Sequence, residues 1–207
     1  ALPGARQEAR DIARRLGAPQ RLLLGEEANK AALFDALRGP VRLLHLASHA
    51  EIDGERPRRS AVLLAGDDRW TAADIAESSL DGAIVVLAAC EGAEGEALQH
   101  GVLGLSDALL QAGARTVIAS LHPVSDSAMG QAMPALYDEL VAGVRADEAV
   151  RRVARTQPVA RSLRVLGDGS ARLGAPPSRS RWTLFAGLLV LGGLMAGAGW
   201  WRTRGSA

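Results

Sequence analysis

A histidine and a cysteine each follow a predicted strand, and together they could carry out nucleophilic catalysis. His49 lies in the run HLASHA at 45–50, and Cys90 closes the apolar run VVLAAC at 85–90. If the two strands are neighbours in one sheet, the imidazole can reach the sulfur, activate the thiolate and later protonate a leaving amine. This pair would make the chain a cysteine hydrolase. Taken singly, Cys90 also fits a small buried side chain, and His49 a surface loop.

Two further features could complete such a site, because functional groups gather at the carboxyl ends of parallel strands. Cys90 is followed by Glu91 and Gly92, a turn whose backbone N–H groups could hold an oxyanion. Asp126 begins a predicted helix after another strand. Its carboxylate either caps that helix or binds a basic substrate side chain at the rim of the same crevice.

The elements that must position these residues alternate between helix and strand. Asn29 and Thr71 are expected to cap two of the helices, and Gly113 to end a third. The alternation predicts an α/β fold, with a mostly parallel sheet flanked by helices. Helices are expected at 6–16, 29–38, 70–78, 104–113, 126–142 and 146–156, and strands at 21–24, 41–48, 61–65, 83–89 and 114–121.

Composition excludes several kinds of site. The formal net charge is +1, so no strong field favours nucleic acid, and the one cysteine rules out an internal disulfide framework and a cysteine-based zinc site. The four histidines are scattered, and we expect neither a metal nor a cofactor. The glycines around 101–104 do not follow a strand and therefore fail the context test for a phosphate-binding loop.

The C-terminal part of the chain differs from the rest in its composition. Residues 182–201 carry no charge, have tryptophans at both ends and match the ~20 residues that span a bilayer as a helix. A buried hydrophobic helix is the alternative. More arginines precede this segment than follow it, which favours a cytoplasmic body, a membrane helix at 182–201 and a short outer tail at 202–207. Residues 158–181 are expected to form a linker. Gly193 and Gly197 form a GxxxG pattern that could support a homodimer.

The motifs together resemble the CHAT family, caspase-like cysteine peptidases related to separases. The resemblance covers most of residues 2–157, in order, and rests on LPGARQEARDIARRLG, LLLGEEANKAALFDAL, LLHLASHAEIDGERPRRSAVLLA, VVLAACEGAEGE, GVLGLSDALLQAGARTVIASLHPVSDSA and ALYDELVAGVRADEAVRRVARTQ. It implies a caspase–hemoglobinase-like fold with His49 as general base and acid and Cys90 as nucleophile. It also implies that Asp126 lines the pocket for the residue before the cleaved bond, with a preference for arginine.

The chain departs from the family pattern at several positions. Ala50 stands where the family usually has glycine after the catalytic histidine, so an oxyanion donor there, beside that of Cys90, is in doubt if the backbone needs a positive φ. His122 and Gly92 replace a common tryptophan and threonine. The family's earlier strands and its closing segment after Gln157 are not recognisable, and helical repeats that commonly precede the domain are expected upstream or on another chain.

The leading hypothesis is therefore a membrane-anchored, caspase-like cysteine endopeptidase that cuts a protein substrate after a basic residue. Its peptidase domain would comprise residues 1–157, truncated at its N-terminus. The alternative is a catalytically inactive CHAT-like interaction module held at a membrane. A soluble small-molecule α/β hydrolase is disfavoured because the chain has no serine nucleophile elbow.

Overall fold

The computed structural model describes residues 3–17, 20–88, 95–120, 124, 126–174 and 187–192, and the side chains of 3, 4, 95–101, 126, 127 and 187–192 are not included in the description. The helices are α1 (Pro3–Leu16), α2 (Lys30–Ala36), α3 (Ala72–Ala76), α4 (Gly95–Gln111), α5 (Asp126–Val141) and α6 (Ala146–Thr156), with 3-10 turns η1 (Gly25–Glu27), η2 (Pro57–Arg59) and η3 (Pro158–Ser162). The strands are β1 (Arg21–Leu24), β2 (Val41–Ala47), β3 (Ala50–Glu51), β4 (Ala61–Leu63), β5 (Arg69–Thr71), β6 (Ile84–Leu87), β7 (Thr116–Ser120), β8 (Leu163–Gly167) and β9 (Gly187–Gly192).

A mostly parallel sheet forms the centre of the fold. Within the described residues it has six strands in the order β1-β9-β2-β6-β7-β8, and a second sheet has the order β3-β4-β5. Every pairing in the large sheet is parallel except that of β7 with the edge strand β8. The predicted α/β class with a mostly parallel sheet is confirmed.

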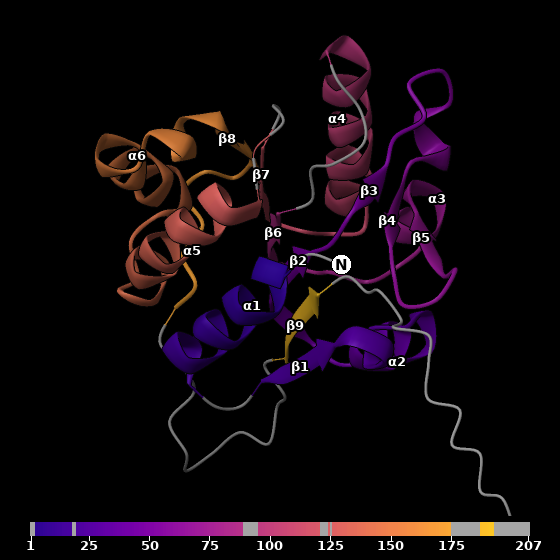
Figure 1. Cartoon of the computed structure of the whole chain (residues 1–207), viewed down its shortest axis with the longest axis horizontal. Coiled ribbons are helices and arrows are strands. Elements are labelled where there is room, and N and C mark those ends of the chain that lie inside the picture. Colours follow the sequence, from indigo (N-terminus) through magenta and orange to yellow (C-terminus); the bar gives the residue numbers. More distant parts are fainter. Residues whose placement is uncertain are drawn as a thin grey trace, which may run out of the picture.

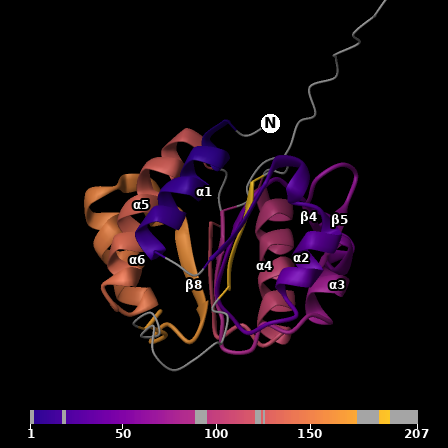
Figure 2. The same ribbon diagram turned by 90° about the horizontal axis from the view of Figure 1, so that it is seen from below.

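Helices cover both faces of this sheet (Figures 1 and 2). One face packs against α2, α3 and α4 through residues such as Leu33, Ile75 and Leu105, and the other against α1, α5 and α6 through Ile12 and Leu136. Strands β6 and β7 are buried along their whole length, as their continuous apolar runs predict.

Local signals in the sequence place three of the described helix ends. The Asn29 side chain accepts a 3.0 Å hydrogen bond from the Ala32 amide at the start of α2. Thr71 and Asp74 form a reciprocal capping box at the start of α3. Gly113 has φ +96°, a conformation that glycine adopts without strain, two residues after the last residue of α4. These three predictions are confirmed.

The segment after Gln157 differs from the expected linker. Residues 158–162 form η3, and residues 163–167 form β8, which pairs antiparallel with β7. The chain then stays packed on the domain, since Ala171 is only 1% exposed. The Arg, Gly, Pro and Ser content of 157–181 predicted a linker, although part of the segment forms a short edge strand. A strand that is paired on one side only needs no long apolar run, so the sequence pattern did not indicate it.

The apolar C-terminal segment also differs from expectation where it is described. Residues 187–192 form β9, paired parallel with β1 on one side and β2 on the other, whereas a helix was predicted over 182–201. The remaining residues of 182–201 lie outside the described residues. No helix within the described part of the chain is long and apolar enough to cross a membrane. A continuous apolar run suits a buried strand as well as a buried helix, so the sequence pattern alone cannot choose between them.

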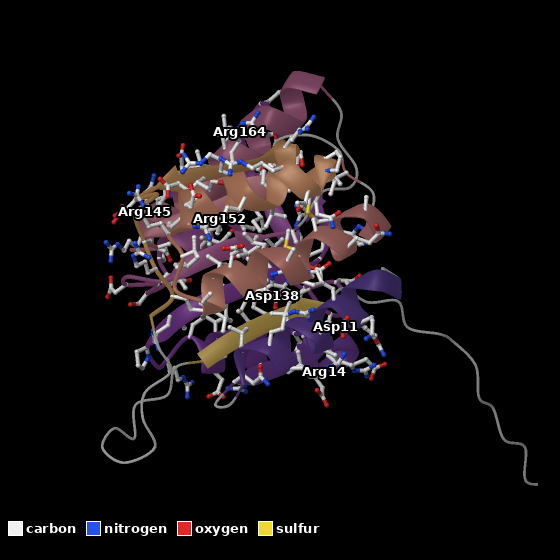
Figure 3. The ribbon with its side chains drawn as sticks, turned by 90° about the vertical axis from the view of Figure 1, so that its left-hand side faces the viewer. Asp11, Arg14, Asp138, Arg145, Arg152 and Arg164 are labelled. Carbon is white, nitrogen blue, oxygen red and sulfur yellow. The ribbon has the colours of Figure 1, made fainter. Side chains whose placement is uncertain are left out.

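Charged side chains cover the outer surface of α1, α5 and α6 (Figure 3). Arg15 of α1 lies 2.8 Å from Asp138 of α5, and Arg152 of α6 lies 3.0 Å from Glu139 of α5. Such exposed pairs contribute little individually, about 0.2–1 kcal/mol each. The layer of α1, α5 and α6 is therefore held mainly by its apolar contacts with the sheet, and these ion pairs lie on its outer surface.

Candidate active site

The residues around His49 are fixed by the neighbouring strand β4. Ser48 is 2% exposed and its hydroxyl donates to the carbonyl oxygen of Leu63. The amide of Leu63 in turn donates a 2.8 Å hydrogen bond to the carbonyl oxygen of His49. The chain therefore leaves the large sheet at Ala47 and enters the small sheet at Ala50, with half-buried His49 held at the junction.

The backbone at Ala50 is ordinary. No non-glycine residue in the described part of the chain has a positive φ, so alanine costs no strain at this position. Ala50 pairs with Val62, and the bond from Leu63 to His49 makes this a pair without mutual hydrogen bonds. The Ala50 N–H consequently points away from β4. Its use as an oxyanion donor stays a prediction.

The strand before Cys90 is the direct neighbour of the strand before His49. β2 and β6 run parallel, with Leu46 opposite Leu87, and the Ala88 amide donates a 2.9 Å hydrogen bond to the Leu46 carbonyl. His49 and Cys90 each follow that opposed pair by three positions in the sequence. Cys90 itself lies outside the described residues. The condition that the two strands be neighbours is nevertheless met.

Asp126 follows the next strand along the sheet. β7 is the parallel neighbour of β6, and α5, which follows β7, begins at Asp126. In the sequence, the three predicted positions follow β2, β6 and β7, which are adjacent parallel strands of the large sheet (Figure 1). The Asp126 side chain lies outside the described ones, so the choice between capping and substrate binding stays open, as do the roles predicted from Gly92 and His122.

The loop that follows His49 is packed tightly against α4. A Cβ atom added at Gly104 would lie 2.9 Å from the Cβ of Pro57 in η2, closer than such atoms approach in proteins. In the run at 101–104, Gly104 therefore allows α4 to pack closely against Pro57. Within the same loop, the Asp53 amide donates a 3.0 Å hydrogen bond to the Ser60 hydroxyl. These contacts give the segment beyond His49 a defined path.

A buried polar cluster behind β2 was not anticipated from the sequence. Nδ1 of His45, which is fully buried, lies 2.9 Å from the hydroxyl of Tyr137 in α5. Its Nε2 lies 2.9 Å from Oε1 of Glu8 in α1. The Glu8 and His45 atoms are close enough to hydrogen bond but are not aligned for one, so we treat the pair as an electrostatic contact.

Burial and the nearby carboxylate keep the tyrosine of this cluster protonated. Burial, and secondly the Glu8 carboxylate, raise the pKa of Tyr137 well above its usual value, so its hydroxyl stays protonated and can donate to His45. Which of the two groups donates in that hydrogen bond depends on the tautomer of His45. The sequence did carry a signal for this cluster. Glu8 falls at the helical spacing of the buried residues Ala5, Ala9 and Ile12, on the apolar face of α1.

Comparison with known proteins shows the family of the chain. The profile of the CHAT domain matches residues 1–165. The chain belongs to the CHAT-domain family. The family is caspase-like, and the match runs into β8, beyond the point where the motifs alone were recognisable.

One curated relative is human tetratricopeptide repeat protein 28, which is 35% identical over 104 residues. That alignment covers 50% of this chain and 4% of the relative. The relative is thus far longer than the segment that it shares with this CHAT-domain protein.

Proposed function

We propose that this CHAT-domain protein is a caspase-like cysteine endopeptidase, with Cys90 as nucleophile and His49 as general base and acid. The observation that carries the proposal is the parallel pairing of β2 with β6, which brings the chain positions before both residues to one edge of the sheet. The fixed turn at Ser48 and His49 supports it, because a catalytic base must be held in place to be effective.

The reaction follows from the chemistry of the two groups. His49 takes the thiol proton, and the Cys90 thiolate attacks the peptide carbonyl to give a tetrahedral oxyanion. Backbone N–H groups of Ala50 and Cys90 are the proposed donors to that oxyanion. The protonated imidazole then gives its proton to the leaving amine, which leaves a thioester. Water, deprotonated by His49, cleaves the thioester and regenerates the thiol.

Asp126 supplies the proposed substrate preference. A carboxylate near the start of α5, at the same edge of the sheet, would pair with a guanidinium group of the residue before the cleaved bond. An arginine is favoured over a lysine because its planar fork can form two parallel hydrogen bonds with a carboxylate. Cleavage of a protein substrate would therefore be limited to peptide bonds that follow a basic residue.

A membrane anchor at residues 182–201 is the second part of the proposal. The charge-free stretch, its terminal tryptophans and the arginines on both sides support it, with the catalytic domain on the cytoplasmic side. The GxxxG pattern at Gly193 and Gly197 would allow two anchors to pair. In this anchored form residues 187–192 are helical, so they cannot at the same time form β9.

A helical-repeat region is the proposed regulatory partner, either upstream in a longer chain or on a separate protein. Its support is the name of the human relative, a tetratricopeptide repeat protein. Repeats of this type offer extended concave surfaces that bind other proteins.

Cleavage of a peptide library tests the proposal. The 207-residue chain should cut after arginine, Cys90→Ala should abolish cutting, and Asp126→Asn should remove the preference for arginine while leaving residual cleavage. If the chain cuts no peptide, alone or with its partner, the inactive interaction module becomes the better account. If Asp126→Asn leaves the preference unchanged, Asp126 serves α5 as a cap and does not bind substrate.

A further inference from the structure

The buried cluster of Glu8, His45 and Tyr137 joins three elements of the fold. Glu8 comes from α1, His45 from β2 and Tyr137 from α5, and each is at most 5% exposed. Nδ1 of His45 lies 2.9 Å from the Tyr137 hydroxyl, and Nε2 lies 2.9 Å from Oε1 of Glu8. The proposed reaction does not use this cluster, although β2 leads to His49 and α5 begins at Asp126.

Helix α5 has a weak point between its first residue and Tyr137. Pro134 lies inside α5 and has no N–H, so the carbonyl of Gly130 receives no helical hydrogen bond from position 134. Glycine is, after proline, the residue that least favours the interior of a helix. The segment 126–133, which begins with Asp126, is therefore joined to the rest of α5 by a weakened hydrogen-bond ladder.

Glu8 lies beside this weak point. A Cβ atom added at Gly130 would lie 3.5 Å from Oε2 of Glu8, so the carboxylate lies against the backbone of Gly130. Its other oxygen, Oε1, faces His45, which contacts Tyr137. Glu8 thus contacts α5 before Pro134, whereas Tyr137 belongs to α5 after it. His45 contacts both of these side chains from β2, so the cluster spans the weak point.

Apolar packing alone would fix α5 less exactly. α1 and α5 lie side by side on one face of the sheet (Figure 2), and Met129 and Met133 belong to their shared core, on either side of Gly130. Methionine side chains are unbranched and adapt to shifts of their neighbours. Buried polar groups are directional, and separating them is costly in a medium of low dielectric constant. The cluster is therefore suited to hold α5 at one position relative to β2.

We propose that this cluster holds the two parts of α5 together across Pro134 and thereby positions Asp126 relative to His49. Glu8 is then a positioning residue for the arginine preference of the site. The inference rests on the proposed function, in which Asp126 binds the substrate arginine and His49 is the catalytic base. It adds that the spacing between these two groups is set by buried contacts behind β2.

A double-mutant cycle tests this role. It compares the 207-residue chain with Glu8→Gln, with Pro134→Ala and with the double variant. Pro134→Ala restores an N–H that can donate to the carbonyl of Gly130, so α5 no longer depends on the cluster for its continuity. Asp11→Asn is the matched control, because it also removes a carboxylate from α1, but one that pairs with Arg14 of the same helix.

Two properties of each protein are measured. Amide hydrogen exchange at residues 130–133 reports on the first turn of α5, because these N–H groups donate to the carbonyls of residues 126–129. The amides of α6 serve as an internal reference. Cleavage of an arginyl peptide, and of the same peptide with norleucine in place of arginine, gives the ratio of the two kcat/KM values.

Glu8→Gln should speed exchange at residues 130–133 by about 5-fold or more, the size of coupling common between contacting residues, and leave α6 unchanged. The arginine-to-norleucine ratio should fall by a similar factor, mainly through a higher KM for the arginyl peptide. With Pro134→Ala present, both effects of Glu8→Gln should shrink to less than about 2-fold. Asp11→Asn should change neither property.

Unchanged exchange at residues 130–133, or an equal change with and without Pro134, would overturn the role of the cluster in α5. Faster exchange with an unchanged arginine-to-norleucine ratio would overturn the positioning of Asp126. If no protein cuts either peptide, the proposed function fails, and the exchange rates still decide whether the cluster holds α5. If Glu8→Gln also loosens α6, Tyr137→Phe replaces it in the cycle with the same expected results.

Discussion

The backbone amide of Ala88 donates a 2.9 Å hydrogen bond to the carbonyl oxygen of Leu46, the last contact described between β6 and β2 before the candidate catalytic positions. This bond continues the parallel pairing past Leu87, toward the position of Cys90. Parallel neighbours of this kind bring groups far apart in the sequence to one edge of a sheet. The pairing is the structural basis for treating His49 and Cys90 as one site.

The turn before His49 should be important for rate. In Ser48→Ala the hydroxyl that donates to the Leu63 carbonyl is lost, so His49 is less well fixed. We expect kcat to fall by about 10- to 100-fold with little change in KM, since small displacements of a catalytic group are costly. Steady-state cleavage of an arginyl peptide measures both constants.

Ser78→Ala is the matched control, because the Ser78 hydroxyl donates a 3.0 Å hydrogen bond to the Asp74 carbonyl, at the end of α3. It should leave kcat unchanged. Equal losses in the two variants would show that Ser48 contributes only general stability.

The buried cluster behind β2 should contribute measurably to folding. Tyr137→Phe keeps the ring but leaves Nδ1 of buried His45 without its hydrogen-bond partner, at a cost of about 1–3 kcal/mol in the free energy of unfolding. Val141→Ala alters the same helix at a side chain that is 40% exposed and should cost less than about 0.5 kcal/mol. Urea unfolding followed by circular dichroism separates the two. Equal effects would contradict a role for the hydroxyl.

Two glycines with positive φ distinguish backbone strain from steric conflict. Gly143 has φ +77° and open space around it, so Gly143→Ala should destabilise the protein by about 1–2 kcal/mol from backbone strain alone. At Gly113, an added Cβ would also lie 3.2 Å from the Cα and 3.3 Å from the amide nitrogen of Asp81. Gly113→Ala should therefore cost clearly more. Thermal and urea unfolding of both variants test this order, and the reverse order would refute the close contact at Asp81.

The carboxyl group of Asp168, in the connection after β8, should titrate at low pH. Hydrogen bonds from the Ser170 side chain and from Arg115 lower the pKa of Asp168 from 3.8 to about 2. Because the folded pKa lies below the unfolded value, the associated stabilisation is present above about pH 4 and disappears as the pH falls through about 2. Carboxyl chemical shifts followed by NMR should show this low pKa, and Ser170→Ala should raise it. A pKa near 3.8 in the parent chain would contradict these contacts.

Features set by neighbouring residues could be predicted from the sequence. The caps at Asn29 and Thr71 and the helix end at Gly113 depend on groups within a few residues, and all three lie where expected. The pairing of β2 with β6 is less local and was a condition of the sequence argument, because β3, β4, β5 and α3 lie between these two strands in the chain.

Features set by distant contacts could not be predicted. β8 is stabilised by pairing with β7, and β9 by pairing with β1 and β2. These pairings leave no signal in the sequence of the two strands themselves. The contact between Glu8 and His45 joins α1 to β2, and only the position of Glu8 on an apolar helix face indicated it. At the candidate site, the neighbouring strands are established, whereas the roles of His49, Cys90, Ala50 and Asp126 remain proposals.

The most direct test of the central claim is the rate of Cys90 alkylation near neutral pH, which is unambiguous because the chain has one cysteine. Intact-mass spectrometry should follow labelling by an arginyl chloromethyl ketone and, for comparison, by iodoacetamide, in the parent chain and in His49→Gln. The account predicts rapid arginyl labelling near neutral pH that His49→Gln slows by about 10- to 30-fold, because a thiol with the ordinary pKa of about 8.5 is only about 3% thiolate at pH 7 and an imidazole partner lowers that pKa. Equal rates in the two proteins, with the arginyl reagent no faster than iodoacetamide, would contradict a His49–Cys90 dyad.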